Sequence, residues 1–132
     1  MSNLLLKSPH DASVLSFAVT ARKLDEVIFE VFIKTGQFTG RASASTYHSG
    51  SPVAMFRAMA IEWQGWSGEK RWEDLEGRVT FIATSDPTGH IKLQASLQGE
   101  DYESSLHAIL QFEAGQLEAM ARDIELFLGE HT

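Results

Sequence analysis

The sequence contains no cysteine among its 132 residues. It therefore has no disulfide, no thiolate nucleophile and no cysteine-ligated zinc site. It also lacks any stretch that approaches the roughly 18 consecutive apolar residues of a membrane-spanning helix. The leucines at positions 4–6 are too few for a signal peptide. We expect a soluble, unprocessed protein of the cytoplasm, whose reducing conditions suit a chain without disulfides.

Basic residues are sparse, and no basic run exceeds Lys70-Arg71. The formal net charge is −7, from 11 Lys and Arg against 18 Asp and Glu. Such a chain repels phosphate backbones, which argues against nucleic-acid binding, whereas a basic protein partner is permitted. The sequence also lacks glycine-rich phosphate loops, the nucleophile motif Gly-x-Ser-x-Gly and the metal motif His-Glu-x-x-His. We therefore expect neither a cofactor nor a metal.

The length predicts a single domain over residues 1–132. Apolar residues alternate with a period of two, the signature of a strand, over residues 15–21, 27–33, 79–83, 91–97 and 102–112. Two more strands are predicted at residues 4–7 and 38–46, and helices at 53–63 and 114–128. This β-β-β-β-α-β-β-β-α order predicts an α+β fold: an antiparallel sheet of about seven strands with two helices packed on one face.

Two glycines mark expected hairpin turns. Gly36 and Gly99 each suit a two-residue turn that requires positive φ. The registers that follow pair Ala21 with Val27, Ile33 with Phe38, and Leu97 with Tyr102. In the last hairpin, His107 then faces Lys92, and His90 lies diagonally beside it. An adjacent ammonium disfavours a metal, so we interpret both histidines as surface residues.

All three tryptophans lie within residues 63–72, among glycines and charges. They form either a stacking platform for a ligand or a plug of the core. Trp63 continues the apolar stripe of the first helix, and Trp72 lies three residues before Leu75, as in a helical turn, so both are predicted to be buried. Trp66 lies between glycines and is predicted to be the most exposed. The candidate ligand- or partner-binding residues are Trp63, Trp66, Glu69, Arg71 and Trp72.

The same segment is rich in acids: Glu62, Glu69, Glu73, Asp74 and Glu76. Paired carboxylates could act as acid and base in glycoside hydrolysis. Acids at this density are more typical of a solvated surface with local charge pairs. We assign no catalytic residue.

Four apolar residues fall on strand faces that are otherwise polar: Ile28, Phe32, Ile82 and Ile109. An apolar second face of a sheet indicates a partner, which can be another copy of this chain, another protein, or a sandwich that closes on itself. We predict that these residues form an interface, most simply a homodimer.

The pattern W-x-G-W-x-G-E-x-R-W over residues 63–72 resembles a family of small uncharacterised bacterial proteins classed as a domain of unknown function. The resemblance continues through Gly89-His90 and through residues 110–117, whereas the first fifty residues match only in strand pattern. It implies no activity, cofactor or catalytic residue.

The leading hypothesis is a non-enzymatic protein-binding factor of an immunity-like or regulatory kind. The alternative is a small-molecule-binding protein with a tryptophan-lined pocket. A hydrolase that uses the acidic tryptophan segment is the least favoured.

Overall fold

The computed structural model of the protein describes residues 3–129. The first half of the chain forms β1 (Leu4–Lys7), β2 (Val14–Arg22), β3 (Val27–Lys34), β4 (Thr39–Ser45) and α1 (Val53–Ile61). The second half forms β5 (Lys70–Glu73), β6 (Val79–Ser85), β7 (His90–Gln98), β8 (Ser105–Glu113), a short 3₁₀ helix η1 (Ala114–Gln116) and α2 (Leu117–Leu128). The fold is mixed α+β, as the sequence pattern predicted.

The strands form two antiparallel sheets of four strands each, so the prediction of a single sheet of seven was wrong. One sheet has the order β1-β2-β3-β4 and the other β5-β6-β7-β8. The strand missing from the prediction is β5, at the end of the tryptophan segment. It has four residues, of which only Trp72 is buried. Its sequence, KRWE, contains a single apolar side chain, so no alternation marks it as a strand.

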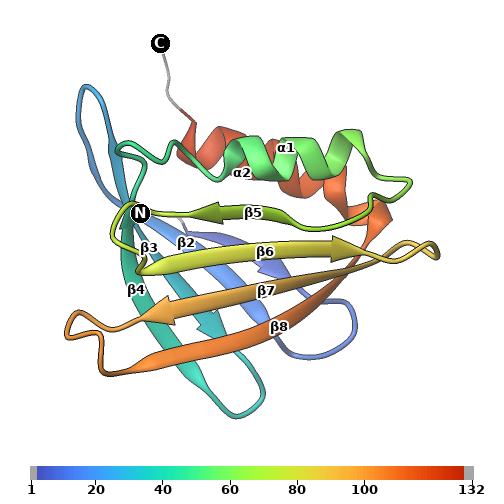
Figure 1. Ribbon diagram of the computed structural model, residues 1–132, viewed down its shortest axis with the longest axis horizontal. Coiled ribbons are helices and arrows are strands. Elements are labelled where there is room, and N and C mark those ends of the chain that lie inside the picture. Colours follow the sequence, from blue (N-terminus) through green and yellow to red (C-terminus); the bar gives the residue numbers. More distant parts are fainter. Residues whose placement is uncertain (1–2, 130–132) are drawn as a thin grey trace.

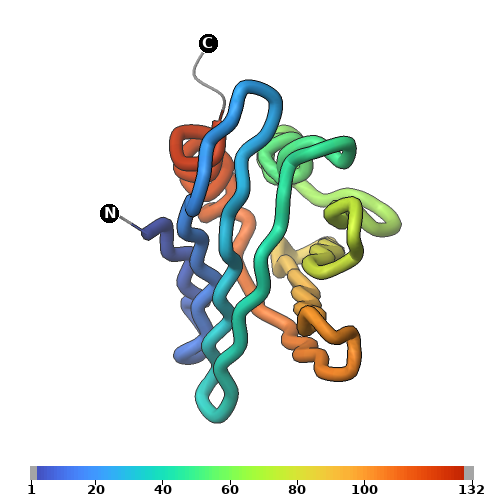
Figure 2. Tube along the Cα trace, turned by 90° about the vertical axis from the view of Figure 1, so that its left-hand side faces the viewer, coloured from blue at the N-terminus to red at the C-terminus, as the bar shows by residue number. Residues whose placement is uncertain are grey.

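The two sheets face each other across one apolar core (Figures 1 and 2). The ring centroids of Phe17 in β2 and Phe81 in β6 lie 6.0 Å apart. Those of Phe29 in β3 and Trp72 in β5 lie 6.1 Å apart. The alternation in the sequence shows which face of each strand is apolar, but it does not show which strands share a sheet. Two facing sheets satisfy the same pattern as one sheet covered by helices.

The helices pack against each other and lie beside edge strands, α1 next to β5 and α2 next to β1 (Figure 1). They close one side of the space between the sheets, instead of covering one face of a single sheet as predicted. Phe56 of α1 reaches the ring of Phe81, with 6.3 Å between centroids. The buried residues of α2 recur at helical spacing and form one apolar face: Leu117, Met120, Ile124 and Leu128.

The first helix begins where predicted and ends earlier. The N–H of Val53 donates to Ser51 Oγ at 3.1 Å. The last helical residue is Ile61, so Trp63 lies in the turn that follows and does not continue the apolar stripe. This turn closes when the N–H of Gly65 donates to the carbonyl of Glu62 at 2.9 Å.

The pairing of β2 with β3 follows the prediction except near one end. Phe17 pairs with Val31 and Val19 with Phe29, as expected. A bulge after Val19 then shifts the register, so that Val27 pairs with Arg22 and not with Ala21. An extra residue in one strand is invisible to an alternation argument.

The other two predicted registers are wrong by two and four residues. Ile33 pairs with Gly40, not Phe38, and Leu97 pairs with Leu106, not Tyr102. Even shifts leave the same side chains facing the core, which is why the predicted apolar faces survive.

The predicted positive φ at Gly36 and Gly99 is also wrong, because neither adopts it. The loop between β7 and β8 is longer than a two-residue turn, with the N–H of Gly99 donating to the carbonyl of Ser104 at 2.8 Å. Its positive φ, 60°, belongs to Tyr102.

Candidate functional site

The tryptophan segment runs from the end of α1 to the edge strand β5. On the way, the backbone turns at Gly65 and Gly68, whose φ angles are 121° and 78°. Side chains with a Cβ avoid this region, so the path depends on these two glycines. The three indoles consequently lie in three different environments.

Trp72 is a core residue, with 6% of its surface exposed. Its ring stacks on Phe81, with 5.8 Å between centroids and 27° between planes. Its indole N–H donates to the carbonyl of Gly50 at 3.0 Å, so its polar atom is satisfied. The prediction that Trp72 is buried is confirmed, although it lies on a strand and not on a helical turn.

Trp66 is half-buried and packs against the core. Its indole N–H donates to the carbonyl of Ala83 in β6 at 3.3 Å. Lys70 Nζ lies 5.2 Å from the ring centroid, within the range of a cation–π contact. The prediction that Trp66 is the most exposed tryptophan was therefore wrong.

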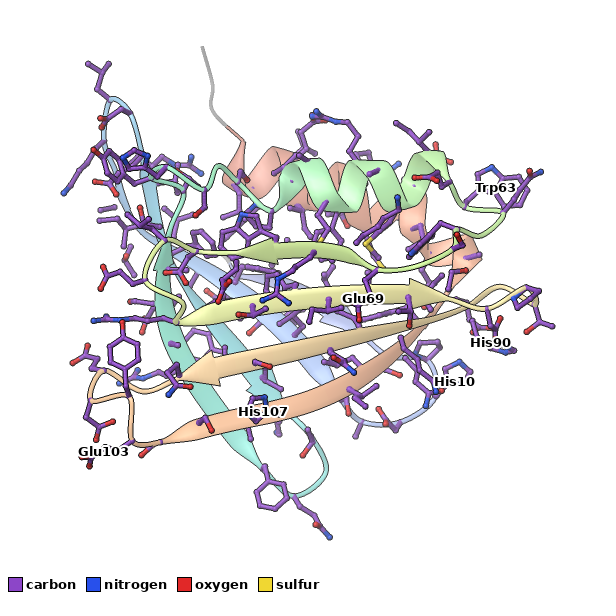
Figure 3. The ribbon with its side chains drawn as sticks, in the orientation of Figure 1. His10, Trp63, Glu69, His90, Glu103 and His107 are labelled. Carbon is purple, nitrogen blue, oxygen red and sulfur yellow. The ribbon has the colours of Figure 1, made fainter. Side chains whose placement is uncertain are left out.

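Trp63 is the exposed tryptophan, with 56% of its surface accessible (Figure 3). It was predicted to be buried as a continuation of the first helix. Because α1 ends at Ile61, the side chain of Trp63 is carried past the helix and away from the core. Ile61 beside it is 74% exposed.

A hollow of about 400 Å³ lies next to Trp63, between the end of α1 and the start of α2. We call it the helix groove. It is lined by Arg57, Ala60, Ile61, Trp63, Ala114, Gly115 and Glu118. Alanine and glycine residues leave space, while the exposed isoleucine and tryptophan supply apolar surface. The helix groove can therefore hold an apolar side chain of a partner.

Arg57 connects the helix groove with a larger hollow of about 530 Å³. This second hollow lies where α1 begins and α2 ends, and it too is lined by Arg57, together with Val27, Leu126 and Leu128. The guanidinium of Arg57 forms an ion pair with Glu125 of α2. The surface between the two hollows is therefore polar at its centre.

The other two predicted binding residues do not join Trp63. Glu69 is exposed and lies away from Trp63, near the start of β5 (Figure 3). Arg71 Nη2 lies 3.4 Å from Glu73 Oε1 on the outer surface of its sheet. There Arg71 lines a separate hollow that also includes His107. The structure thus divides the predicted binding set between different surfaces.

Several acids of the segment have structural partners. Asp74 is 6% exposed, and its Oδ1 accepts hydrogen bonds from the N–H groups of Arg78 at 2.7 Å and Val79 at 3.0 Å. Glu62 pairs with Lys70, and Glu76 Oε2 lies 3.4 Å from Arg78 Nη2. The contacts of Asp74 and Glu76 hold the turn between β5 and β6, and the Glu62–Lys70 pair joins the end of α1 to the start of β5. They give no support to a catalytic carboxylate pair.

A cluster that sequence reasoning missed brings His10 and His90 together (Figure 3). Both Nε2 atoms face the carboxylate of Glu113, at 3.0 Å and 3.8 Å. The carboxylate of Asp86 accepts hydrogen bonds from the backbone N–H of His90, which has the larger effect, and from the hydroxyl of Thr88. These bonds lower the pKa of Asp86 to about 2. His10 and Glu113 are 103 positions apart, so no local pattern could indicate their contact. Within residues 3–129, no group of three or more His, Asp and Glu side chains is arranged to hold a metal ion.

His107 lies elsewhere. It pairs across the ladder with Ser96, not Lys92, and its Nδ1 lies 2.8 Å from Ser96 Oγ. His90 pairs with Glu113 and is therefore not a neighbour of His107. Both histidines are exposed on the outer surface of the sheet, as expected.

The four outward apolar residues lie on two different sheets. Ile28 and Phe32 belong to β3, whereas Ile82 and Ile109 belong to β6 and β8. The two sheets turn these faces away from each other, so the four residues do not form one continuous patch, and their role in an interface stays a prediction. Ile109 is 54% exposed, and the other three are partly buried.

Comparison with known proteins identifies a family and no functional relative. Neither the curated proteins nor the solved structures contain a match to this chain. Among the helices of residues 3–129, none has the length and apolar character needed to cross a membrane. A family model does match, and it extends over nearly the whole sequence. The chain belongs to the family of unknown function DUF6228, whose model matches residues 3–131.

Proposed function

We propose that this protein is a non-enzymatic protein-binding domain, and that the helix groove with Trp63 at its rim is its contact surface. The observation that carries the proposal is the exposure of Trp63 and Ile61 beside a hollow with a small-residue lining. Tryptophan is enriched among the few residues that supply most of the energy of a protein interface. A free tryptophan side chain at the edge of a groove is an anchor of this kind.

The composition of the groove favours a particular partner. Ala60, Ala114 and Gly115 leave room for an apolar side chain, and Arg57 and Glu118 place charges at the margin. An apolar centre with a polar rim is the usual arrangement of protein interfaces. The net charge of −7 favours a partner with a basic surface. In this proposal the protein acts by binding and covering a surface of its partner, as immunity or regulatory factors do.

The small-molecule alternative is weaker, because the three indoles do not converge on one cavity. Trp63 lines the helix groove, and Trp72 lines a separate hollow of about 360 Å³ that includes Met55. Trp66 is held against β6 through its indole N–H. Of the predicted binding residues, the proposal therefore keeps Trp63 as the anchor and leaves Glu69 and Arg71 outside.

Photo-crosslinking in the cell that makes the protein tests this proposal. A photoreactive phenylalanine derivative replaces Ile61 in one variant and Leu24, a fully exposed residue of the β2–β3 loop, in the control. We expect a discrete protein adduct from position 61, none from position 24, and loss of the adduct when Trp63→Ala is added. Equal adducts from both positions, or an adduct that survives Trp63→Ala, would contradict the proposal.

A further inference from the structure

The free edge of β8 is a second exposed feature, separate from the helix groove. β8 pairs with β7 on one side, and no strand within residues 3–129 pairs with its other side. At the two ends of the β7–β8 ladder, the N–H of Gly99 bonds to the carbonyl of Ser104, and the N–H of Ala114 bonds to that of Gly89. Antiparallel strands bond at every second residue, so even-numbered residues of β8 face β7.

The odd-numbered residues of β8 therefore turn their backbone N–H and carbonyl groups toward the free edge. At the centre of the strand these are His107, Ile109 and Gln111, whose side chains are also exposed on the outer face. An edge of this kind is a template for pairing with another strand.

The three other edge strands carry features that protect an edge. β1 and β5 have only four residues each and lie beside helices. β5 also carries Lys70 and Arg71, and β4 carries Arg41 near its centre. Short length, charge and a covering element are the usual means by which proteins prevent edge pairing.

β8 has none of these features. It is nine residues long, and its sequence SLHAILQFE contains no proline, lysine or arginine. Its one acid, Glu113, is at the end of the strand. This contrast with the other three edges favours pairing of the β8 edge with another strand.

We infer that two copies of this protein pair antiparallel through β8, with Ile109 next to the two-fold axis. The two β5-β6-β7-β8 sheets would then join into one continuous sheet. In this register Ile109 meets its own copy, His107 lies opposite Gln111, and Ser105 lies opposite Glu113. No like charges face each other along the edge, so the strand is electrostatically compatible with itself.

The outer face of the sheet supports this register. Ile82, Gln94 and Ile109 lie side by side across β6, β7 and β8. Pairing about Ile109 places two such rows end to end and covers the 54% exposed isoleucine. Ile82 and Ile109 of the predicted interface would thus belong to the dimer, whereas Ile28 and Phe32 on the other sheet would not.

Sedimentation equilibrium of matched variants tests the inference. Ile109→Lys places a charge on the edge, and Leu75→Lys places the same charge on a 60% exposed residue of the β5–β6 turn. We expect twice the monomer mass for the wild-type protein and for Leu75→Lys, and the monomer mass for Ile109→Lys with an unchanged circular dichroism spectrum. A monomeric wild type, or a dimer that persists in Ile109→Lys, overturns the inference.

Two measurements remain informative if Ile109→Lys fails to fold. In the wild type, we expect the amides of His107, Ile109 and Gln111 to be protected from hydrogen exchange. Fast exchange of these three amides, together with protection of the even-numbered amides of β8, would show that the edge is open. Because the chain has no cysteine, Ile109→Cys provides a single thiol. Mild oxidation should link two copies rapidly at this position and slowly in Leu75→Cys; equal rates at both positions refute the register.

Discussion

Replacing Trp72 by alanine should destabilise the fold far more than the same change at Trp63. Trp72 is 6% exposed and packs against Phe29 and Phe81. Deletion of a large buried aromatic side chain costs about 3–5 kcal/mol. The carbonyl of Gly50 also loses its indole donor, but Gly50 is exposed and water can replace that bond. The total stability of a domain is typically about 5–15 kcal/mol, so this single change removes a large share of it.

The control is Trp63→Ala. Trp63 is 56% exposed, and its indole N–H donates no hydrogen bond within residues 3–129, so its removal should change the unfolding free energy by about 0.5 kcal/mol or less. Trp72→Phe separates the ring from the N–H and should cost about 1–2 kcal/mol, because most of the packing is kept.

Urea unfolding followed by far-ultraviolet circular dichroism measures all three variants, since that signal does not depend on which tryptophan is missing. Equal destabilisation by Trp63→Ala and Trp72→Ala would show that Trp63 is packed. That result would refute the conclusion that Trp63 is exposed while Trp72 is buried. It would also refute the role of Trp63 as a binding anchor.

Three further predictions concern the segment and its neighbours. Trp66→Ala should cost about 1–2 kcal/mol in urea unfolding, because a half-buried ring and one hydrogen bond to Ala83 are lost. Asp74→Ala should cost about 1–3 kcal/mol, because the buried carboxylate accepts two backbone N–H groups, whereas exposed Glu76→Ala should be nearly neutral. The pKa of Asp86 is lowered from 3.8 to about 2, so its contribution to stability is present above its unfolded pKa and is lost as the pH falls from about 4 to about 2. Asp86→Asn should flatten the dependence of the unfolding free energy on pH in that window; an unchanged slope would contradict the lowered pKa.

The apolar pattern of the strands could be predicted because it is a local property. Side chains alternate across a strand with a period of two, so Phe17, Phe29 and Phe81 could each be assigned to a core-facing side without knowing any partner strand. The stripe of α2 follows from the helical period in the same way. Even the wrong hairpin registers kept the correct faces, because they were displaced by even numbers of residues.

The candidate site could not be predicted in the same way, because its geometry depends on where local elements stop. Trp63 and Trp66 exchanged their expected environments once α1 ended at Ile61 and the chain turned at Gly65. A helical stripe indicates which residues would share a face if the helix continued, but it does not show where the backbone leaves the helix. The residue at which the helix ends depends on the competition between helix propagation and the packing of the following segment on β6.

The sequence by itself determined the strand faces, the two helices, the absence of thiol chemistry and the acidic charge. Only the tertiary structure decided that the strands divide into two facing sheets, that Trp63 is free while Trp66 is held, that His10 meets Glu113, and that β8 is the unprotected edge. The physical reason is that the first group depends on the identity and spacing of neighbouring residues. The second depends on contacts between segments far apart in the chain, and several arrangements of such segments bury the same apolar faces equally well.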